Sequence, residues 1–190
     1  MDKLLTFIRI PKNASTSMYY HIHRINTIVD EDLPFLDEHH KIFAPSHCTL
    51  SQAVKTLGEE ILKKIVFAVC RNPYDRMVSQ YCFVQSQEFI PRKFKDFAEF
   101  VDFCVEEDTI ASHSQSHYLD MDVNIDILRF ERLTEDWCRF LSRHSLPINP
   151  ILPRLNKTSR KNGIDYYTPS IKQKVAKMWL EDFRRFNYPM

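Results

Sequence analysis

Short apolar runs alternate along the chain with stretches whose apolar residues recur at helical spacing. Three runs have the length and composition of strands: Leu4–Ile10, Ile65–Cys70 and Asn124–Phe130. The second, IVFAVC, is continuous and rich in β-branched residues, which is typical of a parallel strand covered on both faces. Helical spacing predicts helices over residues 18–25, 52–64, 74–85, 94–105, 134–145 and 168–186. This order predicts an α/β fold of three layers, α/β/α, around a central and mainly parallel sheet.

Local signals mark where several of these helices begin. Asn72 is suited to cap the helix that follows it, with Pro73 at its first position. Thr134 is expected to cap the next-to-last helix, and Thr168-Pro169 to begin the last one. The 190 residues, 44% of them hydrophobic, suit one domain over residues 1–190 with a packed core.

Composition excludes several classes of protein. Glycine occurs only at positions 58 and 163, so neither a G-x-G-x-x-G fingerprint nor a G-x-x-x-x-G-K-[ST] loop can be present. The formal charge of +1 argues against nucleic-acid binding and against a polybasic membrane surface. Five widely spaced cysteines, most of them in apolar runs and none in a C-x-x-C pair, indicate buried, reduced thiols and no metal site. No signal peptide and no long apolar run is found, so we expect a cytoplasmic protein that does not bind membranes.

The segment PKNASTS, residues 11–17, lies between the first predicted strand and the first predicted helix. A strand–turn–helix directs backbone N–H groups and the positive end of the helix dipole toward the space beyond the strand. Lys12 adds a cation and Ser15, Thr16 and Ser17 add hydroxyl donors, a combination suited to phosphate or sulfate. The alternative is an ordinary helix start, where Ser and Thr are favoured in any case.

A second polar motif, CRNPYDRMVSQY at residues 70–81, follows the central predicted strand. Arg71 stands at the end of a buried strand, where a guanidinium is costly unless it meets an anion. Ser79 lies about two helical turns further on. Alternatively, Arg71 pairs with Asp75 or Asp136 and Ser79 is a surface hydroxyl. Ligands of parallel α/β sheets bind beyond the carboxyl ends of the strands, where both motifs are expected.

Taken together, these motifs resemble those of the sulfotransferases that use 3′-phosphoadenosine 5′-phosphosulfate (PAPS). PKNASTS is similar to the family's 5′-phosphosulfate loop, and CRNPYDRMVSQY to its 3′-phosphate motif. ILRFERL, LPRLNKTSRKN and the segment from Tyr167 to Tyr188 resemble later parts of the family, so the similarity spans nearly the whole chain. Ala14 and the Asn-Lys-Thr stretch are closest to the membrane-type glycan sulfotransferases of the uronyl 2-O group.

The resemblance implies a P-loop-like sulfotransferase fold and a role for each matching residue. Lys12 would be catalytic, contacting the bridging oxygen of PAPS and stabilising the leaving phosphate. Arg71 and Ser79 would bind the 3′-phosphate, and Arg160 and Lys161 would close over the cofactor. The 5′-phosphosulfate would be held by the loop residues Asn13, Ala14, Ser15, Thr16 and Ser17.

Sulfuryl transfer to a hydroxyl also needs a base, and histidine titrates in the appropriate range. Among eight histidines, His47 matches the position of the catalytic histidine of the uronyl-type enzymes, with His39 and His40 as further candidates. His113 and Gln115 fall in a segment similar to one that lines the family's acceptor side, so they are candidates for substrate binding.

These observations favour a sulfotransferase that moves the sulfuryl group of PAPS to an acceptor hydroxyl by in-line transfer with a histidine base. We expect the acceptor, a small molecule or a glycan, to be a carbohydrate. Two alternatives stay open. A P-loop-like nucleotide kinase shares the layers, although the chain lacks the usual glycine–lysine pairing and a clear Mg²⁺-binding Asp at a strand end. A non-catalytic module that binds anions or glycans would need only the fold.

Overall fold

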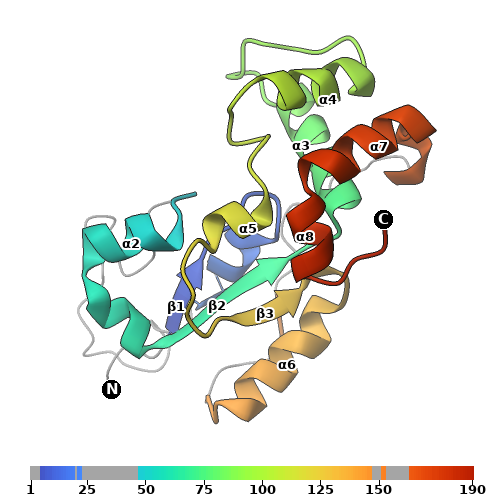
Figure 1. Cartoon of the computed structure of the whole chain (residues 1–190). Helices are drawn as coiled ribbons and strands as arrows, with labels where there is room; N and C mark the ends of the chain where they lie inside the picture. The colour runs from blue at the N-terminus through green and yellow to red at the C-terminus, as the bar shows by residue number, and fades with distance from the viewer. Residues whose placement is uncertain (1–4, 20, 23–46, 147–150, 153–162) are drawn as a thin grey trace. The chain divides into compact units, whose positions relative to one another are not determined.

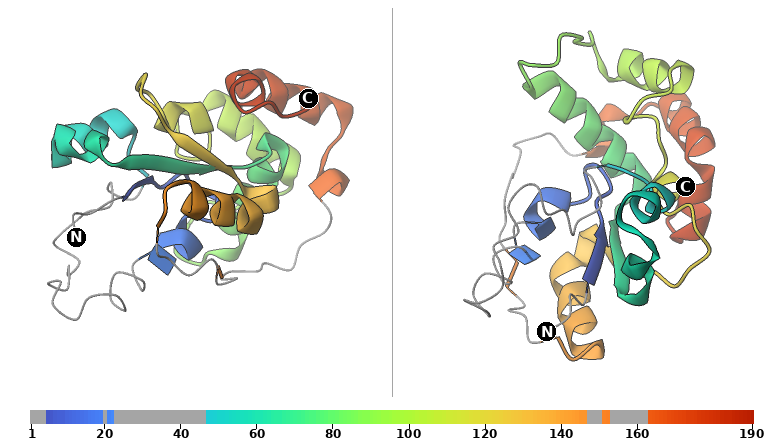
Figure 2. Two further views of the ribbon diagram at one scale, coloured as in Figure 1. Left: turned by 90° about the horizontal axis from the view of Figure 1, so that it is seen from below. Right: turned by 90° about the vertical axis from the view of Figure 1, so that its left-hand side faces the viewer.

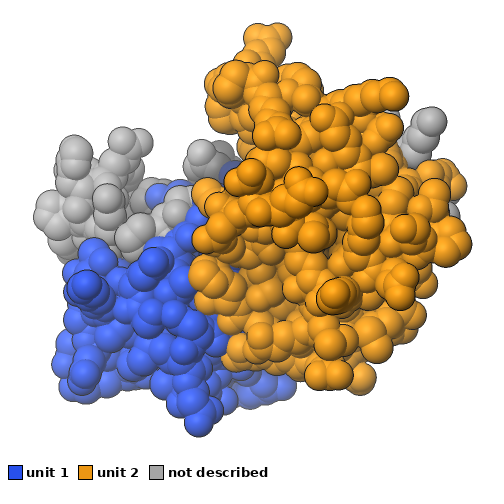
Figure 3. Space-filling model, turned by 45° about the horizontal axis from the view of Figure 1, so that its top comes forward, with its two compact units in different colours: residues 1–70, 118–157 blue, residues 71–117, 158–190 orange. Residues whose placement is uncertain are grey.

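The computed structural model describes residues 5–19, 21–22, 47–146, 151–152 and 163–190. The chain forms two compact units, coloured separately in Figure 3. The first, here called the sheet unit, comprises Met1–Cys70 and Tyr118–Lys157, and the second, the helical unit, comprises Arg71–His117 and Thr158–Met190. A single domain over residues 1–190 stays a prediction.

Among the described residues of the sheet unit, three parallel strands form its centre (Figure 1). They are β1 (Leu5–Ile8), β2 (Ile65–Cys70) and β3 (Asp126–Arg129), in the order β1-β2-β3. The parallel α/β sheet is therefore confirmed, and β2 has the predicted bounds. The outer strands are shorter than predicted: the N–H of Ile10 turns back to the carbonyl of Ile8, and Phe130 already begins a 3₁₀ turn.

Apolar side chains cover the sheet on one face. Phe7 of β1 stacks on Phe67 of β2 with 4.7 Å between ring centroids, and Trp137 and Phe140 of helix α6 (Leu133–Arg143) lie against Phe67. Met18 and Ile22, from the helical residues that follow β1, join the same cluster. Figure 2 shows this segment and α6 together on one side of the strands.

The other face of the sheet carries a different helical layer. Side chains alternate along a strand, so Thr6 points away from Phe7, and its hydroxyl donates to the carbonyl of Ile61 at 2.8 Å. Ile61 lies in the 3₁₀ helix η1 (Glu59–Lys63), which follows helix α2 (Leu50–Leu57). The sheet is thus the middle of three layers, as predicted.

Two predicted helices of the sheet unit begin or end elsewhere. The single helix expected over residues 52–64 is wrong, because Gly58 adopts φ 86° and ψ 164° and separates α2 from η1. Thr134 is not the cap of α6, which begins one residue earlier after Arg132. There the Asp136 carboxylate accepts from the backbone N–H of Arg129 at 2.9 Å.

The helical unit contains α3 (Pro73–Ser86), α4 (Phe97–Glu106), η3 (Gly163–Tyr166), α7 (Pro169–Met178), α8 (Leu180–Arg185) and most of the short α5 (Gln115–Tyr118). The predicted cap at Asn72 is confirmed, since its side chain accepts from the N–H of Tyr74 and Pro73 occupies the first turn. The helix expected over 94–105 begins only at Phe97, because Asp96 caps it. The helix expected over 168–186 is two helices, divided at Trp179.

An aromatic core holds the helical unit together. Phe94, Phe97 and Phe100 are buried in one cluster with Val175 and Trp179. Phe94 and Phe100 meet edge to face with their centroids 5.1 Å apart. Within the described residues, no helix is long and apolar enough to cross a membrane.

Candidate active site

The loop that follows β1 has an unusual backbone for a segment without glycine. Lys12 has φ 66° and Ala14 has φ 57°, both in the left-handed region that favours glycine. Helical residues begin at Ser15, and the carbonyl of Ala14 accepts the first helical hydrogen bond from the N–H of Met18 at 3.0 Å. These torsions bring the chain abruptly from strand to helix, which leaves the first helical N–H groups at the end of β1.

Asn13 fastens this loop to the sheet. Its side-chain Nδ2 donates to the carbonyl of Val69 in β2 at 2.7 Å, and the residue is buried. The part of Asn13 that can serve an anion is therefore its backbone N–H. Ser15 is buried, whereas Thr16 and Ser17 are half-buried, as is Lys12.

His47 lies beside the strand end that leads into the loop. Its Nδ1 is 3.3 Å from the carbonyl oxygen of Arg9, which is 38 positions earlier in the chain. Since a carbonyl only accepts, this bond places a proton on Nδ1 of the imidazole. The Arg9 guanidinium in turn lies 4.5 Å from the centre of the Tyr19 ring.

The backbone around His47 is also held from the other side. His47 has φ 67°, and α2 begins three residues later with Thr49 as its cap in a capping box with Gln52. The Asp120 carboxylate accepts from both the N–H and the hydroxyl of Ser51. Burial acts to raise the pKa of Asp120, but these hydrogen bonds outweigh it and lower the pKa below its ordinary value. Partial burial raises the pKa of the neighbouring Cys48 thiol.

In the helical unit, Arg71 directly follows the last residue of β2, and 5% of its surface is exposed. Its backbone is bonded on both sides by the side chain of Gln115: Oε1 accepts from the N–H of Arg71 at 2.8 Å and Nε2 donates to its carbonyl at 2.9 Å. Ser79 lies on α3, half-buried, about 9 Å along the helix from Pro73 at 1.5 Å per residue.

His113, the other predicted acceptor residue, is engaged at both its ring and its backbone. Its Nε2 lies 2.7 Å from the Asp108 carboxylate, and its ring packs against that of His117. Its carbonyl accepts from the guanidinium of Arg76 at 2.9 Å. The roles of His113 and Gln115 in substrate binding stay predictions. Arg160, Lys161, His39 and His40 lie outside the described residues.

Comparison with known proteins identifies the family. The model of the sulfotransferase family matches residues 2–189. The chain belongs to the sulfotransferase family. A search of curated proteins gave no match. Among solved structures, the chain is similar to the crystal structure of mouse sulfotransferase SULT7A1 complexed with PAP, with a TM-score of 0.66 and 14% identity over 97% of this chain and 85% of that one. At this identity the likeness shows the fold.

Sequence patterns do not indicate every residue that supports the site of this sulfotransferase-family chain. Asp182 is fully buried and accepts from the N–H groups of Gln115 and Ser116 at 2.7 and 2.8 Å. The available signal was an acidic residue on the apolar side of the last predicted helix, between Trp179 and Phe183. Arg9, whose carbonyl holds His47, gave no signal because its contact is made by the backbone.

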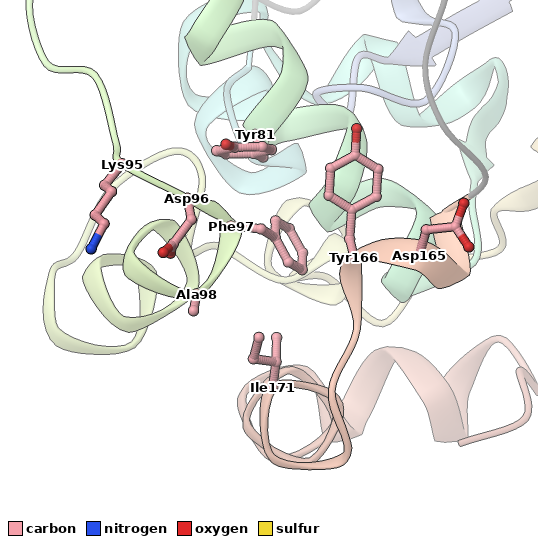
Figure 4. Close-up of a pocket in the computed structure, with 8 residues that line it drawn as sticks. All are labelled: Tyr81, Lys95, Asp96, Phe97, Ala98, Asp165, Tyr166 and Ile171. Atoms are coloured by element: carbon pink, nitrogen blue, oxygen red, sulfur yellow. The ribbon is translucent and has the colours of Figure 1, made fainter.

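The helical unit of this family member also has a shallow hollow of ≈ 360 Å³ beside α4 and η3. Figure 4 shows Phe97, Tyr166 and Ile171 around it, with Lys95 and Asp165 further out. None of the predicted site residues lines it. No group of three or more His, Cys, Asp or Glu is placed to hold a metal ion within the part of the chain that the structure describes.

Proposed function

We propose that this protein transfers the sulfuryl group of PAPS to an acceptor hydroxyl, with His47 as the general base. The observation that carries the proposal is the hydrogen bond between His47 and the carbonyl of Arg9. It holds the imidazole of His47 next to the end of β1, the strand that runs into the predicted anion-binding loop. Family membership supports sulfuryl transfer as the reaction class.

The donor groups fit an anionic nucleotide. The loop supplies N–H groups at a helix start, the Lys12 ammonium, and the hydroxyls of Ser15, Thr16 and Ser17, all of which are donors to phosphate or sulfate oxygens. Arg71 offers a planar guanidinium suited to a phosphate monoester. The two motifs follow the carboxyl ends of neighbouring parallel strands, β1 and β2. The related mouse sulfotransferase was solved with PAP.

The residues of this chain then have complementary tasks. PAPS, when bound, supplies a sulfuryl group attached to a phosphate that is a good leaving group. Nε2 of His47 accepts the proton of the acceptor hydroxyl as the new O–S bond forms. The Lys12 ammonium balances the negative charge that grows on the phosphate as the old S–O bond breaks. Arg9 keeps the imidazole in the tautomer that this proton transfer requires.

The nature of the acceptor is the finer part of the proposal. We favour a carbohydrate hydroxyl, because the loop with Ala14 is most similar to those of glycan sulfotransferases. His113 and Gln115 remain the candidates on the acceptor side. The cytoplasmic location stays a prediction.

Turnover of PAPS carrying labelled sulfate, screened over glycans, phenols and lipids without added metal, tests the reaction. His47→Ala should lower kcat about 10²- to 10⁴-fold, the usual contribution of a general base, and leave the affinity for PAP unchanged. His144→Ala is the matched control. His144 pairs with Asp126 in the sheet unit, and the enzyme should keep its activity when His144 is replaced. Full turnover in His47→Ala would exclude His47 as the base. Mg²⁺-dependent turnover of ATP, with no sulfate transfer, would indicate a kinase instead.

A further inference from the structure

A chain of buried polar contacts runs through the helical unit and ends on the backbone of Arg71. Its members are Asp182 on α8, Gln115 at the start of α5, and Arg71 itself, with exposed fractions of 0%, 0% and 5%. Burying a carboxylate and an amide is costly unless each finds hydrogen-bond partners. Here the partners are specific, so the contacts constrain the backbone they reach.

The contact between Gln115 and Arg71 resembles one rung of a sheet. The Gln115 amide accepts from the N–H and donates to the carbonyl of the same residue, at 2.8 and 2.9 Å. A neighbouring strand would make the same pair of bonds. One side chain thereby fixes the peptide groups on both sides of the Arg71 Cα, and so the direction in which its side chain leaves the backbone.

Gln115 is itself held in place from several directions. The Asp182 carboxylate accepts from its N–H at 2.7 Å and from that of Ser116 at 2.8 Å. Just before it, the carbonyl of His113 accepts from Arg76. The indole of Trp179 donates to the carbonyl of Ser112 at 2.7 Å. The segment from residue 112 to 116 is therefore a fixed support for Arg71.

The chemistry of the side chain matters as much as its position. A glutamine side chain has a carbonyl oxygen that accepts and an NH₂ group that donates. It can therefore bond both the N–H and the carbonyl of Arg71. A glutamate of the same size would set a second acceptor against the Arg71 carbonyl. A methionine of similar length would keep the volume but make neither bond.

We propose that Gln115, oriented by Asp182, is a positioning residue that fixes the backbone of Arg71 so that its guanidinium meets the 3′-phosphate of the sulfuryl donor. This inference rests on the proposed function. It assigns Gln115 a task beyond the predicted one on the acceptor side, and it gives the buried Asp182 a role in donor recognition. Neither residue needs to touch the nucleotide.

The test compares two ligands that differ only in the 3′-phosphate, PAP and 5′-AMP, by isothermal titration. Gln115→Met should weaken PAP about ten- to hundredfold, the effect expected when a charged group is displaced by roughly 1 Å. It should leave the affinity for 5′-AMP unchanged. In an Arg71→Met background the same substitution should have no further effect on PAP, because the positioned group is gone. In turnover, KM for PAPS should rise while kcat changes little.

The chain provides a matched control. Gln85 on α3 makes the same two-sided contact with another backbone, accepting from the N–H of Phe94 at 3.1 Å and donating to its carbonyl at 2.7 Å. Gln85→Met removes equivalent bonds in the same unit. Gln85→Met should therefore lower the stability of the protein as much as Gln115→Met does. It should leave the ratio of PAP affinity to 5′-AMP affinity unchanged.

The outcomes separate the two proposals. If wild-type protein does not bind PAP, the proposed function fails, and the positioning role fails with it. If wild-type protein binds PAP but Gln115→Met loses PAP and 5′-AMP affinity equally, or behaves as Gln85→Met does, the proposed function stands and the positioning role is wrong. If Gln115→Met does not fold, Asp182→Asn replaces it in the test. We expect this variant to lose affinity for PAP but not for 5′-AMP, by a smaller factor than Gln115→Met. An unselective loss there would also refute the role.

Discussion

The φ angle of Ala14 predicts that replacing this residue by glycine stabilises the protein, whereas glycine substitutions usually destabilise one. Ala14 has φ 57°, and an L-residue in this region is destabilised by roughly 1–2 kcal/mol relative to its usual conformations. Ala14→Gly removes that strain. The added freedom of the unfolded chain offsets about 0.4–1 kcal/mol of the gain. We therefore expect the variant to be more stable by on the order of 1 kcal/mol.

Urea unfolding measures this difference. With a slope of about 2 kcal/mol per molar urea, the midpoint of Ala14→Gly should rise by about 0.5 M. Ala53→Gly is the control in the same unit, because Ala53 lies inside helix α2 with ordinary helical torsions. There glycine should lower stability by about 1 kcal/mol or more. If both variants unfold at lower urea, the strain at Ala14 is absent and the reasoning is wrong.

Two further predictions concern the two ends of helix α2. Gly58 has φ 86° and ψ 164°, a region nearly restricted to glycine, and a Cβ there would meet no atom within 4 Å. Gly58→Ala should therefore lose about 1–2 kcal/mol of stability from the torsion alone, and an unchanged urea midpoint would contradict this. Asp120, with its pKa below the ordinary 3.8, should stabilise the fold above that pH and lose its effect as the pH falls through the folded pKa. Thermal unfolding should show Asp120→Asn less stable than wild type at pH 7, with the gap narrowing toward pH 3; a constant gap would refute the linkage.

Much of the fold follows from local sequence. IVFAVC is continuous, β-branched and bounded by polar residues, so nothing competes with its assignment as β2. Asn72-Pro73 defines the start of α3 because both residues act through their own backbone and side chain. Motif order along the chain was also sufficient to identify the family, as the match over residues 2–189 confirms.

Other features depend on contacts that local patterns do not contain. Apolar spacing continues across Gly58 and across Trp179, so periodicity predicted one helix where the chain forms two elements in each case. The sequence predicts Thr134 as the N-cap of α6, but the helix begins at Leu133. The Asp136 carboxylate accepts a hydrogen bond from the nearby Arg129 N–H, a contact that the local pattern does not indicate.

The candidate site shows the same division. Residue types and spacing predicted the loop, Arg71 and His47 as site residues, and these roles stay predictions. The pairings that orient them join residues far apart in sequence: His47 with Arg9, Asn13 with Val69, and Gln115 with Arg71. Such pairings exist only once the sheet and helices have assembled.

The left-handed torsions of Lys12 and Ala14 also determine whether the loop after β1 can keep its conformation outside this protein. A glycine-rich phosphate loop adopts such angles without cost, so a short peptide can sample them. Here the two residues together disfavour the loop conformation by roughly 2–4 kcal/mol, so an isolated peptide would populate it about thirty to a thousand times less. In the folded chain, the hydrogen bond from Asn13 to the Val69 carbonyl of β2 is one of the contacts that offset this cost. If residues 9–19 were grafted into another scaffold, the sequence of the loop would therefore be transferred without its conformation, unless the neighbouring strand were transferred as well.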